Sequence, residues 1–281
     1  MKNKTIILLV TICLVSTFNP SANADHHELG EFEDHRHDTP TTTEGAKRAP
    51  HSATISSEVI YGQSGDQLHK GYLSQPENIK AKSGLIVIHE WWGLNEDIHL
   101  MADQLAGLGY HSLAVDLYDG KSAEGVREAF QLMTGLSKNE DAALANLKEA
   151  YDYLTNELGA EKVGIIGWCL GGKWSLRGSL MLPNEIDATV IYYGSLIDDR
   201  EQLATLEMPI IGFVGTKDRP YINQFIQFDK DLKALNKDYS VHFYEGAGHA
   251  FANASGTAYE PEAAEDSWEK TVKFLATHLT K

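Results

Sequence analysis

The sequence predicts an α/β fold in which a mostly parallel, doubly wound sheet is covered by helices on both faces. Two observations lead to this prediction. From about residue 54 onward, short β-branched runs alternate with longer amphipathic patterns, and the runs at residues 85–88 and 163–166 contain no polar side chain. Strands without a polar face are typical of parallel sheets, because helices bury both of their faces. Alternating strands and helices then imply a right-handed crossover at each step.

Each element is predicted from a local pattern. Short runs rich in β-branched and aromatic residues predict about eight strands, and apolar residues three and four positions apart predict the helices. The predicted strands are Ile55–Tyr61, Tyr72–Ser74, Leu85–His89, Ser112–Asp116, Val163–Gly167, Ala188–Tyr193, Pro209–Val214 and Ser240–Tyr244. The predicted helices are Asp97–Leu108, Glu124–Gly135, Glu140–Glu157, Leu170–Leu182, Tyr221–Leu235 and Pro261–Leu279. Ligands bind at the carboxyl ends of such strands, so the residues that follow each strand are the first candidates for function.

Residues 1–24 have the pattern of a secretory signal. Lys2 and Lys4 give a charged start, residues 5–18 form an apolar core, and residues 22–24 read Ala-Asn-Ala, an A-x-A cleavage site. The apolar run is too short to favour a retained membrane anchor. We therefore expect cleavage after the A-x-A site, a periplasmic or secreted mature protein, and no membrane attachment once the signal is removed.

Residues 25–53 differ in composition from the rest of the chain. They hold five histidines and seven acidic residues but almost no aliphatic side chains. Such a segment buries too little apolar surface to offset its ordering entropy, so we expect a disordered linker that hydrolysis does not need. Its histidines are of the type that binds transition metals weakly, but solvated tails of this composition are more common, and we expect no metal site. The predicted globular domain spans residues 54–281.

Charge and cysteine content exclude two classes of protein. The chain of 281 residues has 40 acidic and 24 basic residues and a net charge of −16, which argues against binding to nucleic acid. Removal of the two signal lysines makes the net charge −18. Cys169 is the only cysteine after residue 24, so the mature chain cannot contain an intrachain disulfide framework.

The strongest chemical signal is the segment Gly167–Gly172, which reads Gly-Trp-Cys-Leu-Gly-Gly. It joins a predicted buried strand to a predicted helix and matches the nucleophile-elbow pattern G-x-S-x-G with cysteine in place of serine. A sharp strand-to-helix turn needs glycines on both flanks, because side chains there would collide with neighbouring backbone. The helix N-terminus behind Cys169 favours a thiolate and offers free N–H groups to an oxyanion.

A cysteine nucleophile needs a base, and the base needs an orienting group. On the elbow hypothesis the chain order is nucleophile, acid, histidine. Asp218 follows the predicted strand at residues 209–214, and His249 follows the last predicted strand. Both positions fall at the sheet edge that carries Cys169. The alternative for Asp218 is a cap of the following helix, and one carboxylate can serve both roles.

Further candidates lie at other strand ends. Glu90 follows a buried strand, where a carboxylate is costly unless it is paired; the alternative role is to anchor a loop. The N–H groups of Trp91 and Leu170 are placed to form an oxyanion hole. Tyr193 is a candidate for lining a substrate pocket, although an aromatic residue at a strand end is as often a packing residue. His89 is most simply a buried, hydrogen-bonded histidine and receives no role.

The sequence resembles the dienelactone hydrolases (carboxymethylenebutenolidases), from about residue 54 to the C-terminus. The resemblance rests on HEWWGLN around Glu90, VDLYDG at residues 115–120, GIIGWCLGG around Cys169, YYG at residues 192–194 and GAGHAF around His249. It implies the α/β-hydrolase fold and a Cys–His–Asp triad, which here is Cys169, His249 and Asp218.

The resemblance also implies roles for other residues. It implies an auxiliary glutamate that interacts with the resting thiol, matched by Glu90, and an oxyanion hole that matches the N–H groups of Trp91 and Leu170. Family members hold the substrate carboxylate with two arginines. Arg127 resembles one of them, and Asn253 stands four residues after the histidine, where the second would lie.

These expectations combine into one function. We expect an exported, cysteine-dependent hydrolase of a small carboxylic ester or lactone, acting through a thioester acyl-enzyme as a monomer, without cofactor or metal. A second interpretation is an acyl-thioester or peptide-bond hydrolase with the same triad, because fold and triad do not identify the acyl group. A third is a non-catalytic binding or metal-buffering protein in which the histidine-rich segment matters.

Overall fold

The computed structural model describes residues 38–78 and 80–280. They belong to one compact unit that extends from His37 to Lys281. The predicted signal and residues 25–37 of the predicted linker lie outside the described residues, so cleavage and export remain predictions. Within the described part of the chain, none of the helices combines the length and the apolar character that crossing a membrane requires.

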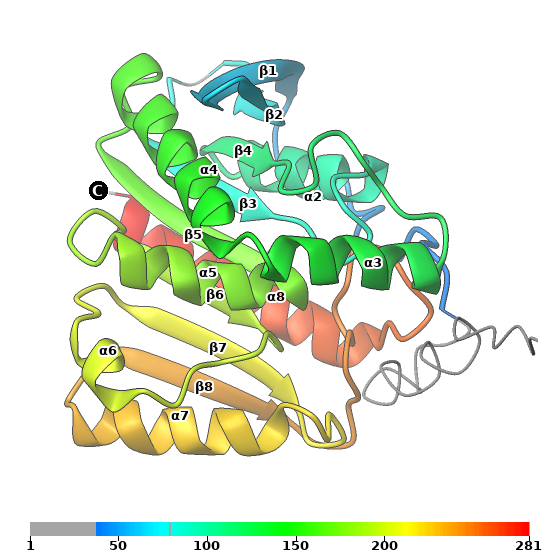
Figure 1. Cartoon of the computed structure of the whole chain (residues 1–281), viewed down its shortest axis with the longest axis vertical. Helices are drawn as coiled ribbons and strands as arrows, with labels where there is room; N and C mark the ends of the chain where they lie inside the picture. The colour runs from blue at the N-terminus through cyan, green and yellow to red at the C-terminus, as the bar shows by residue number, and fades with distance from the viewer. Residues whose placement is uncertain (1–37, 79, 281) are drawn as a thin grey trace, which may run out of the picture. The chain divides into compact units, whose positions relative to one another are not determined.

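Eight strands form a single sheet in the order β1-β2-β4-β3-β5-β6-β7-β8 (Figure 1). Their bounds are Thr54–Ser64 (β1), Gln67–Pro76 (β2), Ser83–Ile88 (β3), His111–Val115 (β4), Lys162–Trp168 (β5), Ala188–Tyr192 (β6), Ile210–Gly215 (β7) and Tyr239–Tyr244 (β8). Strands β4, β3, β5, β6, β7 and β8 run parallel, while β1 and β2 form an antiparallel hairpin at one edge. The predicted mostly parallel sheet is therefore confirmed.

The helices occur where amphipathic patterns predicted them, with one addition. Their bounds are Glu96–Gly107 (α2), Val126–Ser137 (α3), Glu140–Asp152 (α4), Leu170–Met181 (α5), Arg200–Ala204 (α6), Ile222–Ala234 (α7) and Pro261–Leu279 (α8), and a π-helical turn, Tyr153–Glu157 (η2), extends α4. Helix α6 was not predicted, because five residues are too few to show a helical period. The Asp199 carboxylate caps it by accepting hydrogen bonds from the N–H groups of Glu201 and Gln202.

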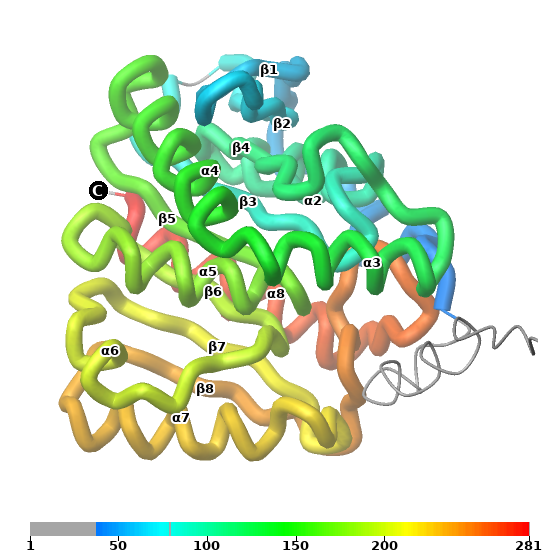
Figure 2. Tube along the Cα trace, in the orientation of Figure 1, coloured from blue at the N-terminus to red at the C-terminus, as the bar shows by residue number. Residues whose placement is uncertain are grey.

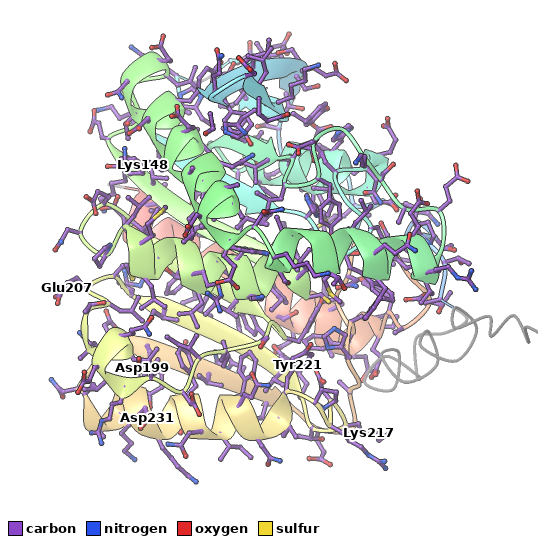
Figure 3. All side chains as sticks on the ribbon, viewed as in Figure 1. Lys148, Asp199, Glu207, Lys217, Tyr221 and Asp231 are labelled. Carbon is purple, nitrogen blue, oxygen red and sulfur yellow. The ribbon has the colours of Figure 1, made fainter. Side chains whose placement is uncertain are left out.

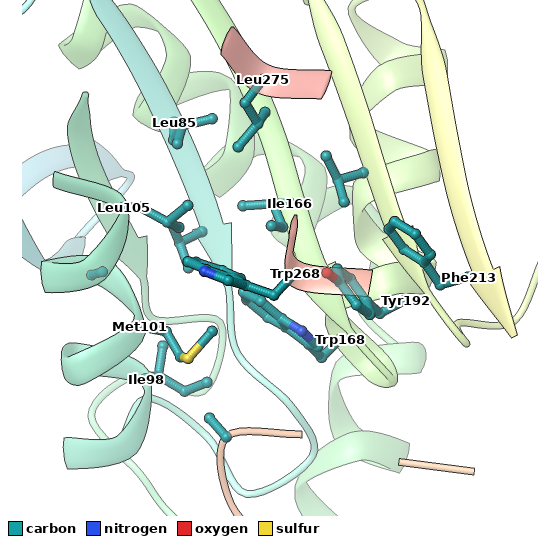
Figure 4. Packing of buried hydrophobic residues seen from close by; sticks show 14 of the residues in the cluster. Leu85, Ile98, Met101, Leu105, Ile166, Trp168, Tyr192, Phe213, Trp268 and Leu275 are labelled. Carbon is teal, nitrogen blue, oxygen red and sulfur yellow. The ribbon is translucent and has the colours of Figure 1, made fainter. Parts of the chain in front are cut away.

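Both faces of the sheet are buried. On one face, side chains of α2 and α8 meet those of β3, β5, β6 and β7 around Trp168, Tyr192 and Trp268 (Figure 4). The Tyr192 hydroxyl lies within hydrogen-bond distance of Thr271 Oγ1, at 2.7 Å, and so satisfies its polar end inside this core. Helices α4, α5 and α7 cover the opposite face. Burial on both faces explains the uniformly apolar strands in the sequence.

Residues 38–53 correct the predicted domain boundary. Composition placed them in the disordered linker, but Thr42 forms a β-bridge with Ser255, and the Thr43 hydroxyl lies within hydrogen-bond distance of two carbonyl oxygens of the same loop. Ala46 is fully buried in the core. Figure 2 shows this blue segment beside the orange loop. The composition argument failed because the segment builds no core of its own and instead packs against one that the domain supplies.

Candidate active site

The turn between β5 and α5 holds Cys169 in a strained conformation. Its φ is 54° and its ψ is −112°, values that a residue with a side chain rarely adopts. The flanking glycines allow the turn: a Cβ at Gly167 would lie 2.3 Å from backbone atoms of Gly171, and one at Gly171 would lie 2.3 Å from the carbonyl oxygen of Ile88. The thiol is partly exposed. The geometry is that of a nucleophile elbow.

The structure brings together the three residues that the sequence order predicted. His249 Nε2 lies 3.1 Å from Cys169 Sγ, and His249 Nδ1 lies 2.8 Å from Asp218 Oδ2. The Asp218 side chain is fully buried, and the imidazole is about one-tenth exposed. No side-chain cap is found at the start of α7, and the carboxylate of Asp218 faces His249 instead. Distances and order match a nucleophile, its base and the group that orients the base.

Charge complementarity keeps a proton on His249. Burial opposes the charged imidazole, but the neighbouring Cys169 and Asp218 outweigh it and raise the pKa of His249 to about 10. With Nδ1–H directed at Asp218, the second proton lies on Nε2 and faces the sulfur. A protonated imidazole beside the sulfur is suited to pairing with a negative charge there.

Two tyrosine rings contact the imidazole of His249. Tyr193 contacts His249 edge-on with ring centroids 5.3 Å apart, and Tyr221, labelled in Figure 3 near the start of α7, contacts it at 5.2 Å. Tyr193 is fully buried, with a φ of 35°. It therefore packs against the predicted base, and its role in lining a substrate pocket stays a prediction. Sequence reasoning missed Tyr221, because nothing local to the residue signals the contact.

Tyr118 is a buried aromatic residue shortly after the end of β4. Burial raises its pKa well above the ordinary value, and the neighbouring Cys169 acts in the same direction. Its hydroxyl is buried and has no hydrogen-bond partner among the described residues. Tyr118 belongs to the VDLYDG motif at residues 115–120.

Glu90 anchors the loop that follows His249. Its Oε1 accepts hydrogen bonds from the N–H groups of Ala254, at 2.6 Å, and Ser255, at 3.4 Å. The side chain is 1% exposed, and this burial raises its pKa well above the usual range. The neutral acid is thus favoured. The contacts found for this carboxyl are loop amides rather than the thiol, so the interaction with Cys169 implied by the family resemblance stays a prediction.

The two predicted oxyanion donors lie where α5 meets β3. Leu170 is the first residue of α5, so its N–H has no partner one turn earlier in the helix. Trp91 follows Glu90 in a tight turn that the Gly93 N–H closes on the Glu90 carbonyl at 3.2 Å. Both segments lie at the carboxyl end of the sheet, because Leu170 follows β5 and Trp91 follows β3. Convergence of the two N–H groups on a substrate oxygen stays a prediction.

The two predicted substrate-binding residues, Arg127 and Asn253, differ in exposure. Arg127 is exposed near the start of α3, a helix that begins on the carboxyl-end side of the sheet (Figure 1). Asn253 is 3% exposed, its carbonyl oxygen lies 2.8 Å from the Thr43 hydroxyl, and its buried amide oxygen has no partner among the described residues. In this conformation its amide is not on an open surface, and binding of substrate by either residue stays a prediction.

The described residues contain no cluster of three or more His, Cys, Asp or Glu side chains able to hold a metal ion. Separately, Cys169, His249 and Asp218 have the arrangement of side chains that acyl transfer uses.

Known proteins resemble this chain over most of its length. The model of the dienelactone hydrolase family matches residues 69–279. Protein usf of Aquifex pyrophilus is 33% identical over 220 residues, covering 75% of this chain and 94% of the relative. A candidate carboxymethylenebutenolidase of Saccharolobus solfataricus is 28% identical over 258 residues, covering 79% of this chain and 98% of the relative.

A solved structure agrees on the fold. The crystal structure of a dienelactone hydrolase-like promiscuous phosphotriesterase from metagenomic libraries superposes with a TM-score of 0.72 at 20% identity, covering 81% of this chain and 99% of that one. The fold is thus the predicted α/β-hydrolase fold. Taken with the match of the family model, these findings show that the chain belongs to the dienelactone hydrolase family and is a carboxylic ester hydrolase.

Proposed function

We propose that this protein hydrolyses a small ester or lactone with Cys169 as its nucleophile, through a thioester acyl-enzyme. One observation carries the proposal: a single imidazole bridges the sulfur, at 3.1 Å, and a buried carboxylate, at 2.8 Å. The raised pKa of His249 supports the proposal, because a protonated imidazole 3.1 Å from the sulfur favours a negative charge on it.

The proposed reaction has two halves. The thiolate attacks the carbonyl carbon, the π electrons move to oxygen, and the N–H groups of Trp91 and Leu170 hold the resulting oxyanion. The tetrahedral intermediate collapses, the C–O bond to the alcohol breaks, and His249 gives its Nε2 proton to the leaving oxygen. Water then attacks the thioester while His249 takes its proton. The thiolate leaves, the carboxylic acid is released, and the imidazolium–thiolate pair is restored.

The substrate class follows from leaving groups and charge. A thiolate leaves a tetrahedral carbon more readily than an alkoxide does, so the first intermediate tends to collapse backwards unless the alcohol is a good leaving group. Enol lactones and activated esters meet this condition, and amides do not. Arg127 is a single cation, Asn253 is neutral, and the predicted mature chain carries a net charge of −18. We therefore propose neutral or singly anchored esters and lactones as better substrates than an anionic dienelactone.

The charge argument is tested by a pair of substrates. A neutral ester and the anionic dienelactone, matched in leaving-group reactivity, are compared by kcat/KM, and Arg127→Ala is expected to slow only the anionic one. Faster hydrolysis of dienelactone by the unmodified protein would overturn the preference for neutral substrates.

Export belongs to the same proposal. The charged start, apolar core and A-x-A site support a mature protein that begins at Asp25 and acts in the periplasm or outside the cell. N-terminal sequencing of protein from the exported fraction tests this point. Recovery of intact Met1, or of cytoplasmic protein alone, would contradict it.

The nucleophile is tested by trapping the intermediate. Purified mature protein is mixed with a nitrophenyl ester, quenched in acid and analysed by mass spectrometry. The expected result is a burst of nitrophenol and an acyl group on the peptide that contains Cys169. Cys169→Ala, the matched control, is expected to lose both. A Cys169→Ala variant that turns over at the unmodified rate would refute the proposed function.

A further inference from the structure

His89 is a fully buried histidine to which neither the triad nor the oxyanion hole assigns a role. It follows the end of β3, and its relative exposure is 0%. Its Nδ1 lies 2.5 Å from the carbonyl oxygen of Glu90, and its Nε2 lies 3.2 Å from the backbone nitrogen of Leu117, which donates to it. The ring of Tyr118 packs against the imidazole with centroids 4.6 Å apart. The ring is thus held at three points.

These contacts fix the tautomer of His89. A backbone N–H can only donate, so Nε2 must accept from Leu117 and carries no proton. Nδ1 then carries the proton of the neutral ring and donates it to the Glu90 carbonyl. Burial lowers the pKa of His89, which keeps the ring neutral in the same pH range. The protonation state required by the contacts is therefore the one that burial favours.

The acceptor of this hydrogen bond belongs to the peptide that supplies an oxyanion donor. The Glu90 carbonyl and the Trp91 N–H are the two ends of one planar trans peptide, so they point in opposite directions. The Glu90 carbonyl also accepts the Gly93 N–H at 3.2 Å. Two donors on one carbonyl fix the rotation of the peptide plane, and hence the direction of the Trp91 N–H. They also polarise the amide, which makes its N–H a stronger donor.

We propose that His89 is a positioning residue of the oxyanion hole: its Nδ1–H holds the Glu90–Trp91 peptide so that the Trp91 N–H faces the substrate oxygen. The inference rests on the proposed function, because it requires an oxyanion to form at this site. The Leu117 N–H keeps the imidazole in the tautomer whose Nδ1 donates. The loop after β4, which contains Leu117, therefore helps to set the orientation of the Glu90–Trp91 peptide at the end of the neighbouring β3.

Two variants that resemble each other in shape, His89→Asn and His89→Leu, separate the effect of the Nδ1–H donor from the effect of side-chain bulk. In His89→Asn the side-chain amide places an N–H near the position of Nδ1, whereas His89→Leu has a similar volume and no donor. Both lose the acceptor for the Leu117 N–H. The difference between the two variants therefore reports the hydrogen bond to the Glu90 carbonyl.

Two reactions of the Cys169 sulfur distinguish a misplaced oxyanion hole from a disturbed triad. Hydrolysis of a nitrophenyl ester passes through an oxyanion, whereas alkylation of Cys169 by iodoacetamide forms an S–C bond and expels iodide without one. For His89→Leu we expect kcat/KM to fall at least about tenfold, part of the hundredfold or more that loss of an oxyanion donor costs. Alkylation is expected to stay within about twofold, because His249 and Asp218 are untouched. His89→Asn is expected to recover most of the ester activity.

Each other outcome overturns the inference. Equal losses of hydrolysis and alkylation in His89→Leu would show that the variant disturbs the triad, and equal hydrolysis by the Asn and Leu variants would show that the donor is irrelevant. If His89→Leu fails to fold, His89→Ala, which adds no bulk, takes its place. An unmodified protein without Cys169-dependent hydrolysis would refute the proposed function instead, which is a distinguishable result.

Discussion

The turn that carries Cys169 and the loop that follows His249 are held in place by different means. Backbone packed against backbone fixes the turn: Gly167 approaches Gly171, which in turn approaches the carbonyl of Ile88. The histidine loop, residues 249–257, is fixed by side chains from distant parts of the chain, including Glu90 and Thr43. The placement of Cys169 therefore depends on a short local pattern, and that of His249 depends on long-range polar contacts.

Side-chain carboxylates also hold the two ends of the histidine loop. Glu260 Oε1 accepts a hydrogen bond from the Gly248 N–H at 2.9 Å, just before His249. At the far end, Asp38 Oδ1 accepts from the N–H of Thr257 at 2.7 Å. A single substitution in the turn should therefore be severe, whereas the loop has several supports and should weaken in steps.

The largest effect is expected from the turn. Gly171→Ala would place a Cβ 2.3 Å from the carbonyl oxygen of Ile88, a backbone atom that cannot swing aside. We expect loss of folded protein or, in any protein that folds, at least a roughly thousandfold drop in ester hydrolysis because the thiol and both oxyanion donors shift. Yield, thermal unfolding and kcat/KM measure it.

Gly248→Ala is the matched control, because a Cβ at Gly248 would meet nothing within 4 Å. Stability and activity close to those of the unmodified protein are expected. A Gly171→Ala variant that behaves like this control would show that backbone contact does not hold the turn.

The next effect concerns the proton on His249. Its pKa is raised to about 10, so the imidazole keeps its proton until the pH approaches that value, and the proposed pair with a Cys169 thiolate is lost only above it. Alkylation of Cys169 by iodoacetamide should therefore change little between pH 6.5 and 9. In His249→Asn the thiol is expected to behave as an ordinary cysteine with a pKa of about 8.5. Its alkylation at pH 6.5 should then be roughly a hundredfold slower, rising tenfold per pH unit.

A parallel pH dependence of alkylation in the two proteins would contradict the proposed ion pair.

The raised pKa of His249 also makes the stability of the fold depend on pH. A histidine whose pKa is higher in the folded state stabilises the fold fully below its unfolded value of 6.5 and loses that contribution as the pH rises through about 10. The stability difference between the unmodified protein and His249→Asn should therefore shrink from pH 6 to pH 10.

Local patterns in the sequence predicted the strands and the order of the candidate triad. Fully apolar strands, flanking glycines and the positions of Asp218 and His249 after strands are visible within a few residues of each feature. The supports of the histidine loop could not be predicted in this way. Thr43 and Ala254 are 211 residues apart, and neither has a pattern that indicates the other. The packing of residues 38–53 was missed for the same reason.

A smaller effect is expected at Glu90. Glu90→Ala leaves the Ala254 N–H buried without its acceptor, which should cost about 1–3 kcal/mol of stability. Ester hydrolysis should fall about tenfold as the loop beside His249 loosens, equivalent to roughly 1.4 kcal/mol of barrier. Glu90→Gln keeps an amide oxygen as acceptor and, like the protonated acid, carries no charge. It should retain the stability of the unmodified protein, and an equal loss in both variants would show that the carboxyl does not anchor the loop.

The smallest effects are expected from changes to the N-terminal segment. Their sizes rank the contacts by which this segment stabilises the histidine loop. Removal of residues 25–37 should leave hydrolysis within about threefold, or roughly 0.6 kcal/mol of barrier. Removal of residues 25–53 also deletes Thr43 and the buried Ala46, and it should lower both stability and activity further. Thr43→Val keeps the shape and loses only the hydroxyl, so it should cost about 1 kcal/mol, the usual contribution of one hydrogen bond. Urea unfolding and kcat/KM of the two deletion variants and of Thr43→Val measure the relative size of these effects.

If the longer deletion matched the shorter one in both measurements, the bridge between Thr42 and Ser255 would contribute nothing to holding His249. Glu90 and Glu260 alone would then support the loop.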